Sequence, residues 1–139
     1  MKWLIISLFV FMGAFVAADK SNKRPIQFPK ESLDNVLKVV DECTKDTGAT
    51  TQAWEFVKES KYEDNKSFKD FLYCILVKTQ YFATNGYPIT DKLFELYKDE
   101  DGRDVIRQCV KSTTAEKPED VTFLLYKCYL ENAPVKLIF

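Results

Sequence analysis

Histidine is absent from this 139-residue chain, and glycine is scarce, with only four residues. Without histidine the chain has no Ser–His or Cys–His dyad, no histidine base and no histidine metal ligand. The scattered glycines form no glycine-rich loop of the kind that holds a phosphate. The sequence therefore predicts a protein that is not an enzyme and that holds no metal ion or other cofactor.

Blocks of like charge are also missing. The 20 basic and 21 acidic side chains are interspersed along the chain and give a net charge of -1. A nucleic-acid-binding face needs clustered positive charge, so we expect no nucleic-acid partner. Beyond the first 18 residues no apolar run is long enough to span a membrane, and we expect no membrane insertion of that part.

The first 18 residues have the pattern of a secretory signal peptide. Lys2 precedes an apolar run from Trp3 to Val16, and the small residues Ala17 and Ala18 follow. The run is short for a membrane span, and polar residues begin directly after it. We predict that residues 1–18 are a signal peptide cleaved after Ala18 and that residues 19–139 are one secreted, extracellular domain. An uncleaved anchor helix is the alternative.

This domain contains four cysteines, Cys43, Cys74, Cys109 and Cys128. An even number of cysteines in a small secreted domain favours disulfides. Zinc is disfavoured because no two cysteines are close in sequence and no histidine is present. We expect two disulfides, for which the count alone leaves three connectivities open.

The stretch Ser67–Phe82 is expected to form the central helix. Read at 3.6 residues per turn, its apolar side chains cover nearly the whole circumference, which is typical of a buried helix. Ser67 with Asp70 resembles a capping box at its start, and Asn85-Gly86 is expected to stop it. Cys74 lies in its middle and should tie this helix to another segment.

Five further helices are expected, and no strand pattern competes with this all-α fold. Their markers are Leu33 to Cys43 with a stop at Gly48, Thr50 or Thr51 before a short helix through Val57, Thr90 before a helix through Tyr97, Val105 to Val110, and Pro118 before a helix through Tyr129. The remaining segments are expected to be a flexible arm over Asp19–Phe28, a polar break over Asp99–Gly102, and irregular chain after Pro134.

The carboxyl-terminal residues are unusually apolar for the end of a chain. Leu137, Ile138 and Phe139 should either cover a hollow in the domain or insert into a partner. The whole chain has 11 phenylalanines, seven tyrosines and two tryptophans. Such an aromatic content suits either a dense core or a cavity with aromatic walls.

The signal-like start, the helical pattern and the cysteine spacing together resemble the insect odorant-binding proteins, the pheromone and general odorant-binding family. Successive cysteines are separated by 30, 34 and 18 residues. That family commonly has six cysteines, with three residues between the second and third and eight between the fifth and sixth. Asp70 and Glu119 stand at the two missing positions, so the chain is similar to the four-cysteine "minus-C" branch.

This resemblance implies a disulfide-stapled domain of six helices around an apolar cavity, with Cys43 bonded to Cys74 and Cys109 to Cys128. It further implies non-covalent carriage of odorants, pheromones or similar small hydrophobic ligands through sensillum lymph or haemolymph. A membrane chemoreceptor is a candidate partner, and the expected state is a monomer or a weak dimer. The alternatives are a lipophile carrier of haemolymph or glands with no olfactory role, and a secreted helical receptor-binding factor with a filled core.

Asp70 and Glu119 allow two interpretations. In the family fold they would face each other, and two adjacent carboxylates raise the pKa of at least one of them. Each also lies in the first turn of its expected helix, where the helix dipole favours an acidic side chain. Our functional hypothesis is that the missing disulfide lets the two helices separate slightly, so that the cavity adapts to varied ligands.

Candidate cavity walls follow from the apolar helix stripes. For each of these residues, ordinary core packing is the alternative. The candidates are Leu37, Val40, Phe56, Leu72, Ile75, Leu93, Leu96, Val105, Ile106, Leu124 and Leu125, with Phe139 near the mouth. Four tyrosines, Tyr73, Tyr81, Tyr126 and Tyr129, are candidates to orient a polar ligand end through a hydroxyl, and the sequence does not choose among them.

Overall fold

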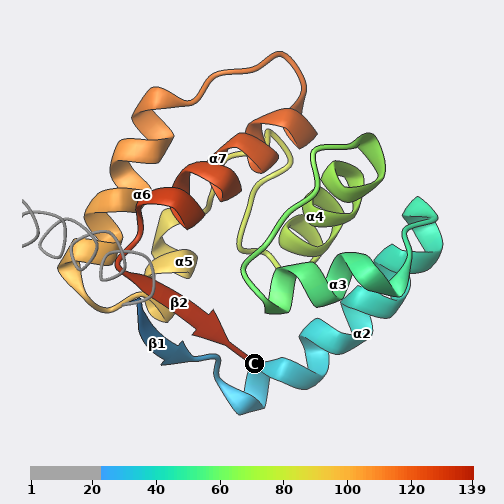
Figure 1. Cartoon of the computed structure of the whole chain (residues 1–139), viewed down its shortest axis with the longest axis horizontal. Coiled ribbons are helices and arrows are strands. Elements are labelled where there is room, and N and C mark those ends of the chain that lie inside the picture. The colour runs from blue at the N-terminus through green and yellow to red at the C-terminus, as the bar shows by residue number, and fades with distance from the viewer. Residues whose placement is uncertain (1–22) are drawn as a thin grey trace, which may run out of the picture.

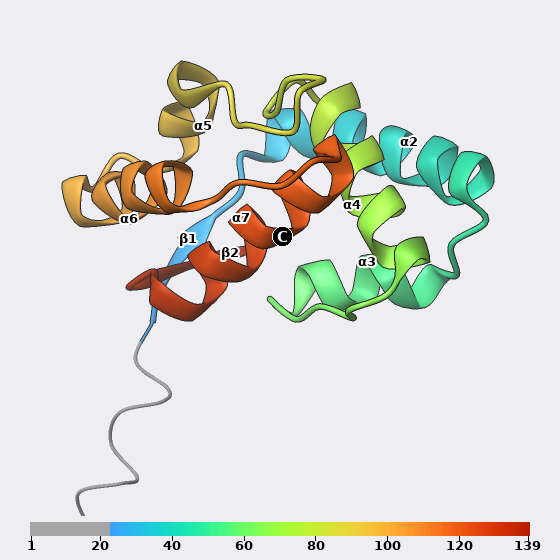
Figure 2. The same cartoon turned by 90° about the horizontal axis from the view of Figure 1, so that it is seen from above.

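The computed structural model describes residues 23–139, and the proposed signal peptide with its cleavage site lies outside these residues. Six α-helices form the described domain, as predicted, and they enclose a common interior (Figures 1 and 2). The helices are α2 (Lys30–Thr47), α3 (Thr51–Lys58), α4 (Lys66–Lys78), α5 (Thr90–Leu96), α6 (Glu100–Ser112) and α7 (Pro118–Asn132). No described helix is long and apolar enough to cross a bilayer.

Two short strands join the ends of the described chain, and the sequence reading missed both. Strand β1 (Arg24–Gln27) pairs in parallel with β2 (Val135–Ile138), and the two run side by side in Figure 1. Phe28 N donates to Ile138 O at 2.8 Å and extends the ladder. The predictions of a flexible arm over Asp19–Phe28 and of irregular chain after Pro134 are therefore wrong where these strands form.

The central helix is α4, and it is shorter than predicted. Phe71 and Leu72 are almost fully buried within it. Its N-cap is Asn65, whose Oδ1 accepts from Phe68 N at 2.8 Å, so the predicted Ser67 cap is wrong. The helix ends at Lys78 because Gln80 adopts a left-handed backbone with φ of 68°.

Gly86 has a different role from the predicted helix stop. It lies in the turn before α5, where its φ is 91° and where a Cβ would collide with the carbonyl of Pro118. Thr122 Oγ1 donates to Gly86 O at 2.8 Å and fixes the turn against α7. This glycine therefore allows close contact between the turn and the start of α7.

The other helix boundaries largely follow the sequence signals. Gly48 ends α2 with a φ of 69°, and Pro118 is the first residue of α7, both as predicted. Thr50 is the N-cap of α3, whereas Thr90 is the first residue of α5 and follows its cap, Ile89. The predicted polar break over Asp99–Gly102 is wrong, because α6 begins at Glu100 with acidic residues in its first turn.

Both disulfides have the connectivity implied by the family resemblance. Cys43–Cys74 joins α2 to α4, and Cys109–Cys128 joins α6 to α7. On the chain-entropy account, loops of this length give roughly 3 to 4 kcal/mol of stability for each disulfide. The four cysteines therefore fix the two helix pairs that flank the interior.

Next to Asp70, one of the two positions where the family's third disulfide is missing, the ammonium group of Lys66 forms an ion pair. Lys66 Nζ lies 2.5 Å from Asp70 Oδ2. The hydrogen bond and charge of Asp70, with a weaker contribution from Glu119, raise the pKa of Lys66. Glu119 is in the first turn of α7, as expected, but Asp70 is not in the first turn of α4, because that helix begins at Lys66.

Candidate functional site: an apolar cavity

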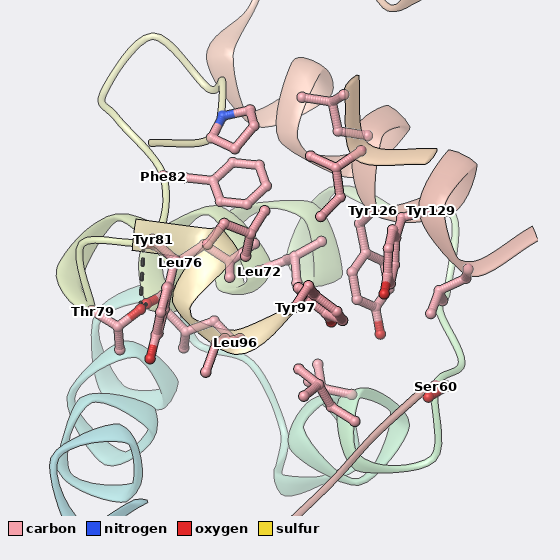
Figure 3. Close-up of a pocket in the computed structure, with 18 of the residues that line it drawn as sticks. Ser60, Leu72, Leu76, Thr79, Tyr81, Phe82, Leu96, Tyr97, Tyr126 and Tyr129 are labelled. Carbon is pink, nitrogen blue, oxygen red and sulfur yellow. Dashed lines mark hydrogen bonds between the residues drawn. The ribbon is translucent and has the colours of Figure 1, made fainter. Parts of the chain in front are cut away.

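A cavity of about 160 Å³ lies inside the domain, and its wall is almost entirely carbon (Figure 3). All six helices and β2 contribute to the wall, together with Phe28 between β1 and α2. The apolar wall includes Phe28, Val36, Trp54, Val57, Leu72, Ile75, Leu76, Phe82, Pro88, Leu93, Leu96, Ile106, Val110, Leu125, Leu130, Leu137 and Phe139. Such a wall excludes water and accommodates apolar molecules.

Seven of the 12 predicted wall residues line this cavity. They are Leu72, Ile75, Leu93, Leu96, Ile106, Leu125 and Phe139. They come from α4, α5, α6, α7 and the segment after β2, which are distant in sequence. The cavity therefore brings these predicted residues together, and their contact with a ligand stays a prediction.

The other five predicted residues lie elsewhere. Leu37 is 45% exposed and Leu124 is 40% exposed, so both point outward from their helices. Val40 is buried in the core, and Phe56 packs edge-on against Phe68 with ring centroids 6.5 Å apart. Val105 is half-buried on α6 and is not part of the wall.

Several of these misses are errors of one residue in helix phase. Val36 lines the cavity in place of Leu37, and Leu125 does so while Leu124 faces solvent. On a helix, adjacent side chains are about 100° apart, so neighbouring apolar residues face different surroundings. Where both residues are apolar, the sequence pattern does not show which one faces inward.

Phe28 and Trp54, which were not predicted, form one side of the wall together with the predicted Phe139. Phe139 stacks on Phe28 with ring centroids 5.2 Å apart, and Trp54 meets the Phe139 ring edge-on, also at 5.2 Å. The parallel pairing of β1 and β2 places Phe28 and Phe139 together. The chain end therefore covers the domain's own hollow, which was one of the two expected roles of the apolar tail.

Three tyrosines form a second group in the wall. Tyr97 follows α5, whereas Tyr126 and Tyr129 lie one turn apart on α7. Figure 3 shows Tyr97 pointing toward the two α7 rings, and the ring centroids of Tyr97 and Tyr129 are 5.1 Å apart. Burial raises the pKa of Tyr129 to about 12 and also raises the pKa values of Tyr97 and Tyr126. The three phenols therefore stay neutral in the physiological pH range.

Among residues 23–139, no group of three or more histidine, cysteine or acidic side chains is placed to hold a metal ion. All four cysteines are paired in the two disulfides, so none of them offers a thiolate. The cavity wall contains one charged residue, Lys136, which is exposed on β2. The arrangement as a whole suits non-covalent enclosure of an uncharged molecule.

The fold and the cavity define a small, disulfide-bonded helical protein with an internal apolar chamber. Residues 26–132 match the model of the PBP/GOBP family, and the chain therefore belongs to this family. Among curated relatives, the B2 protein of Tenebrio molitor is 26% identical in an alignment of 110 positions that covers 76% of this chain and 84% of that protein.

Solved structures with a similar fold include several insect odorant-binding proteins. Odorant-binding protein 1 of Locusta migratoria has a TM-score of 0.64 at 20% identity, covering 78% of this chain and 87% of the other. Odorant-binding protein 28a of Drosophila melanogaster has a TM-score of 0.61 at 16% identity, with coverages of 75% and 93%. Odorant-binding protein 7 of Anopheles gambiae, with four disulfides and an azo compound, has a TM-score of 0.58 at 18% identity, with coverages of 75% and 87%.

Proposed function

We propose that this protein is a secreted carrier that holds small hydrophobic molecules, such as odorants or pheromones, non-covalently in its cavity. The observation that carries the proposal is an apolar chamber covered by the chain's own carboxyl-terminal residues. Enclosure removes the ligand's apolar surface from water, which contributes roughly 25 cal/mol for each Å² buried. Shape and apolar area are then the main determinants of affinity.

The size of the chamber indicates the size of the ligand. Dry apolar cavities of about 150 Å³ bind benzene, and the chamber here is of similar volume at about 160 Å³. Compounds with a single ring therefore fit the cavity without rearrangement. Longer ligands need the helices or the terminal segment to move, which agrees with the absence of a disulfide between positions 70 and 119.

The proposal favours a carrier over a receptor-binding factor with a filled core. Such a factor would use its apolar tail to contact a partner, whereas Phe139 is turned inward against Phe28 and Trp54. The Anopheles relative was solved in complex with an azo compound, which supports a small-molecule ligand for this family fold. We propose no catalytic step, because the wall offers hydroxyls but no general base or nucleophile pair.

Secretion, transport and delivery complete the proposal. The signal-like residues 1–18 would direct the chain to an extracellular fluid, with the mature protein beginning at Asp19. There it would carry ligand as a monomer or weak dimer, in sensillum lymph toward a membrane chemoreceptor or in haemolymph. The family match supports a small-ligand carrier, and the olfactory role is the finer part of this proposal.

Uptake of a fluorescent apolar probe tests this function. N-phenyl-1-naphthylamine should bind the wild-type protein at one site and be displaced by small lipophiles. Leu125→Trp fills the cavity and should abolish uptake, whereas Leu124→Trp adds the same group to the exposed neighbouring position and should leave uptake unchanged. Uptake that is equal in both variants would place the probe outside the cavity and contradict the proposal.

A further inference from the structure

The polar groups in the cavity wall differ in whether they have a partner. Thr79 Oγ1 donates to Ile75 O at 2.6 Å, and Tyr126 Oη donates to Lys61 O at 3.0 Å. Tyr129 Oη is buried, and no hydrogen-bond partner for it lies among the described residues. Buried polar groups are nearly always hydrogen-bonded, so this hydroxyl marks a place where a bound molecule can supply the partner.

Its neighbours keep that place available. The Tyr97 ring packs edge-on against Tyr129 at an interplanar angle of 61°, and a weak contact from the Tyr97 hydroxyl lowers the pKa of Tyr129 against the larger effect of burial. No hydrogen bond of normal geometry satisfies the Tyr129 hydroxyl there, however. Leu125 and Leu130 lie near Tyr129 on α7 and contribute apolar surface to the same wall. The result is an apolar chamber in whose wall the Tyr129 hydroxyl is buried without a hydrogen-bond partner among the described residues.

The charge around this hydroxyl favours a neutral ligand. Burial is the main cause of the raised pKa of Tyr129, and the carboxylate of Asp101 raises it further. The phenol is therefore a neutral donor, and the nearby negative charge opposes an anionic ligand. Lys136, the charged residue of the wall, is exposed on β2, so its ammonium remains solvated.

We propose that Tyr129 is a specificity-determining residue, which selects neutral lipophiles with one hydrogen-bond-accepting oxygen over hydrocarbons of the same shape. Ketones, aldehydes, esters and alcohols belong to this class of ligand. The inference rests on the proposed carrier function and adds the ligand chemistry to it. A bound carbonyl accepts from the Tyr129 hydroxyl, while the remainder of the ligand occupies the apolar chamber.

A matched pair of ligands tests this directly. Acetophenone and α-methylstyrene have nearly the same shape, but acetophenone has a carbonyl oxygen where α-methylstyrene has a methylene group. The wild-type protein should bind acetophenone about two- to tenfold more tightly, as one hydrogen bond allows. Tyr129→Phe should remove this preference by weakening acetophenone binding alone. Tyr73→Phe is the control, because its hydroxyl donates to Thr84 O away from the cavity wall.

Further readouts separate a binding role from a structural one. Tyr129→Phe removes an unpaired hydroxyl, so the melting temperature of the ligand-free protein should not fall. Benzoate, an anion of similar shape, should bind the wild-type protein at least tenfold more weakly than acetophenone. A preference that persists in Tyr129→Phe, an equal loss for both ligands, or benzoate binding as tight as that of acetophenone would overturn the inference alone. Failure of the wild type to bind either ligand or the apolar probe would overturn the carrier function itself.

Discussion

Lys69 Nζ on α4 lies 3.5 Å from Asp120 Oδ1 on α7. The same ammonium lies 3.4 Å from Asp64 and 5.0 Å from the centre of the Phe123 ring. These contacts join the starts of two helices close to positions 70 and 119, where the family's third disulfide is missing. Salt bridges at partly exposed sites are weak and salt-sensitive, so α4 and α7 are joined here less firmly than by a disulfide.

Restoring the disulfide should rigidify the cavity. We expect Asp70→Cys with Glu119→Cys to close a loop of about 50 residues and to add up to about 4 kcal/mol to the free energy of unfolding. Because the helices then separate less, the range of ligand lengths that displace the probe should narrow. Thiol titration and mass measurement establish the bond, and Asp70→Ser with Glu119→Ser is the matched control. A confirmed three-disulfide protein with an unchanged ligand range would contradict the hypothesis.

Removing a natural disulfide should lower stability without abolishing the helical fold. Replacing Cys109 and Cys128 by alanine opens a loop of about 20 residues, which corresponds to a loss of about 3 kcal/mol. Cys43–Cys74 closes a longer loop, so its removal should cost somewhat more. Urea unfolding followed by circular dichroism gives both values, and equal stability of the variants and the wild type would show that the disulfides contribute little.

The terminal phenylalanine should affect both stability and binding. Phe139→Ala removes the ring between Phe28 and Trp54, and we expect a loss of about 1–2 kcal/mol, below that for a fully enclosed phenylalanine. Ligand affinity should fall because the cavity is less well covered. Ile138→Ala is the control, since Ile138 is 39% exposed.

Trp54 fluorescence is a suitable readout for this variant, because the indole directly contacts the Phe139 ring. Its emission should shift to longer wavelength when Phe139 is lost and should respond to ligand in the wild type. An identical response of Phe139→Ala and Ile138→Ala would show that the terminal ring does not cover the cavity.

Alkaline pH should destabilise the domain through its buried phenols. The pKa of Tyr129 is raised to about 12, from 10.0, mainly by burial, and that of Tyr126 is also raised. Below about pH 10 these phenols are protonated in both states, and their contribution to stability is constant. Above it the unfolded chain loses protons first, so stability falls as the pH rises toward 12. Unfolding titrations at each pH measure this decline in stability, and tyrosinate absorbance follows the ionisation itself. Tyr129→Phe should make the decline less steep. An equally steep decline in that variant would contradict the assignment of the raised pKa to Tyr129.

The helices could be predicted because their signals are local, and the number of disulfides followed from the cysteine count, whereas their pairing came from the family resemblance. Gly48 and Pro118 mark helix ends through backbone preferences that hold in any context. The strands were missed because β1 and β2 are four residues each and lie at opposite ends of the described chain. Their pairing depends on tertiary contact, which no local pattern encodes.

Only part of the cavity wall could be predicted, because the direction of a side chain also depends on tertiary packing. On amphipathic α6 the apolar stripe included Ile106, which is buried and lines the cavity, but also Val105, which is half-buried and lies outside the wall. On α7 both Leu124 and Leu125 are apolar, and only the packing of neighbouring helices decides which of them faces inward. The proposal of Tyr129 likewise needed the structure, which gives Tyr73 and Tyr126 backbone partners and leaves the Tyr129 hydroxyl buried without one.

The most direct test of the carrier function is native mass spectrometry of the secreted protein, before and after extraction with organic solvent. We predict a chain that begins at Asp19, contains two disulfides and holds one small lipophile that is lost on extraction. The stripped protein should then take up N-phenyl-1-naphthylamine at one site. A protein that is empty as secreted and that also refuses the probe would contradict the account.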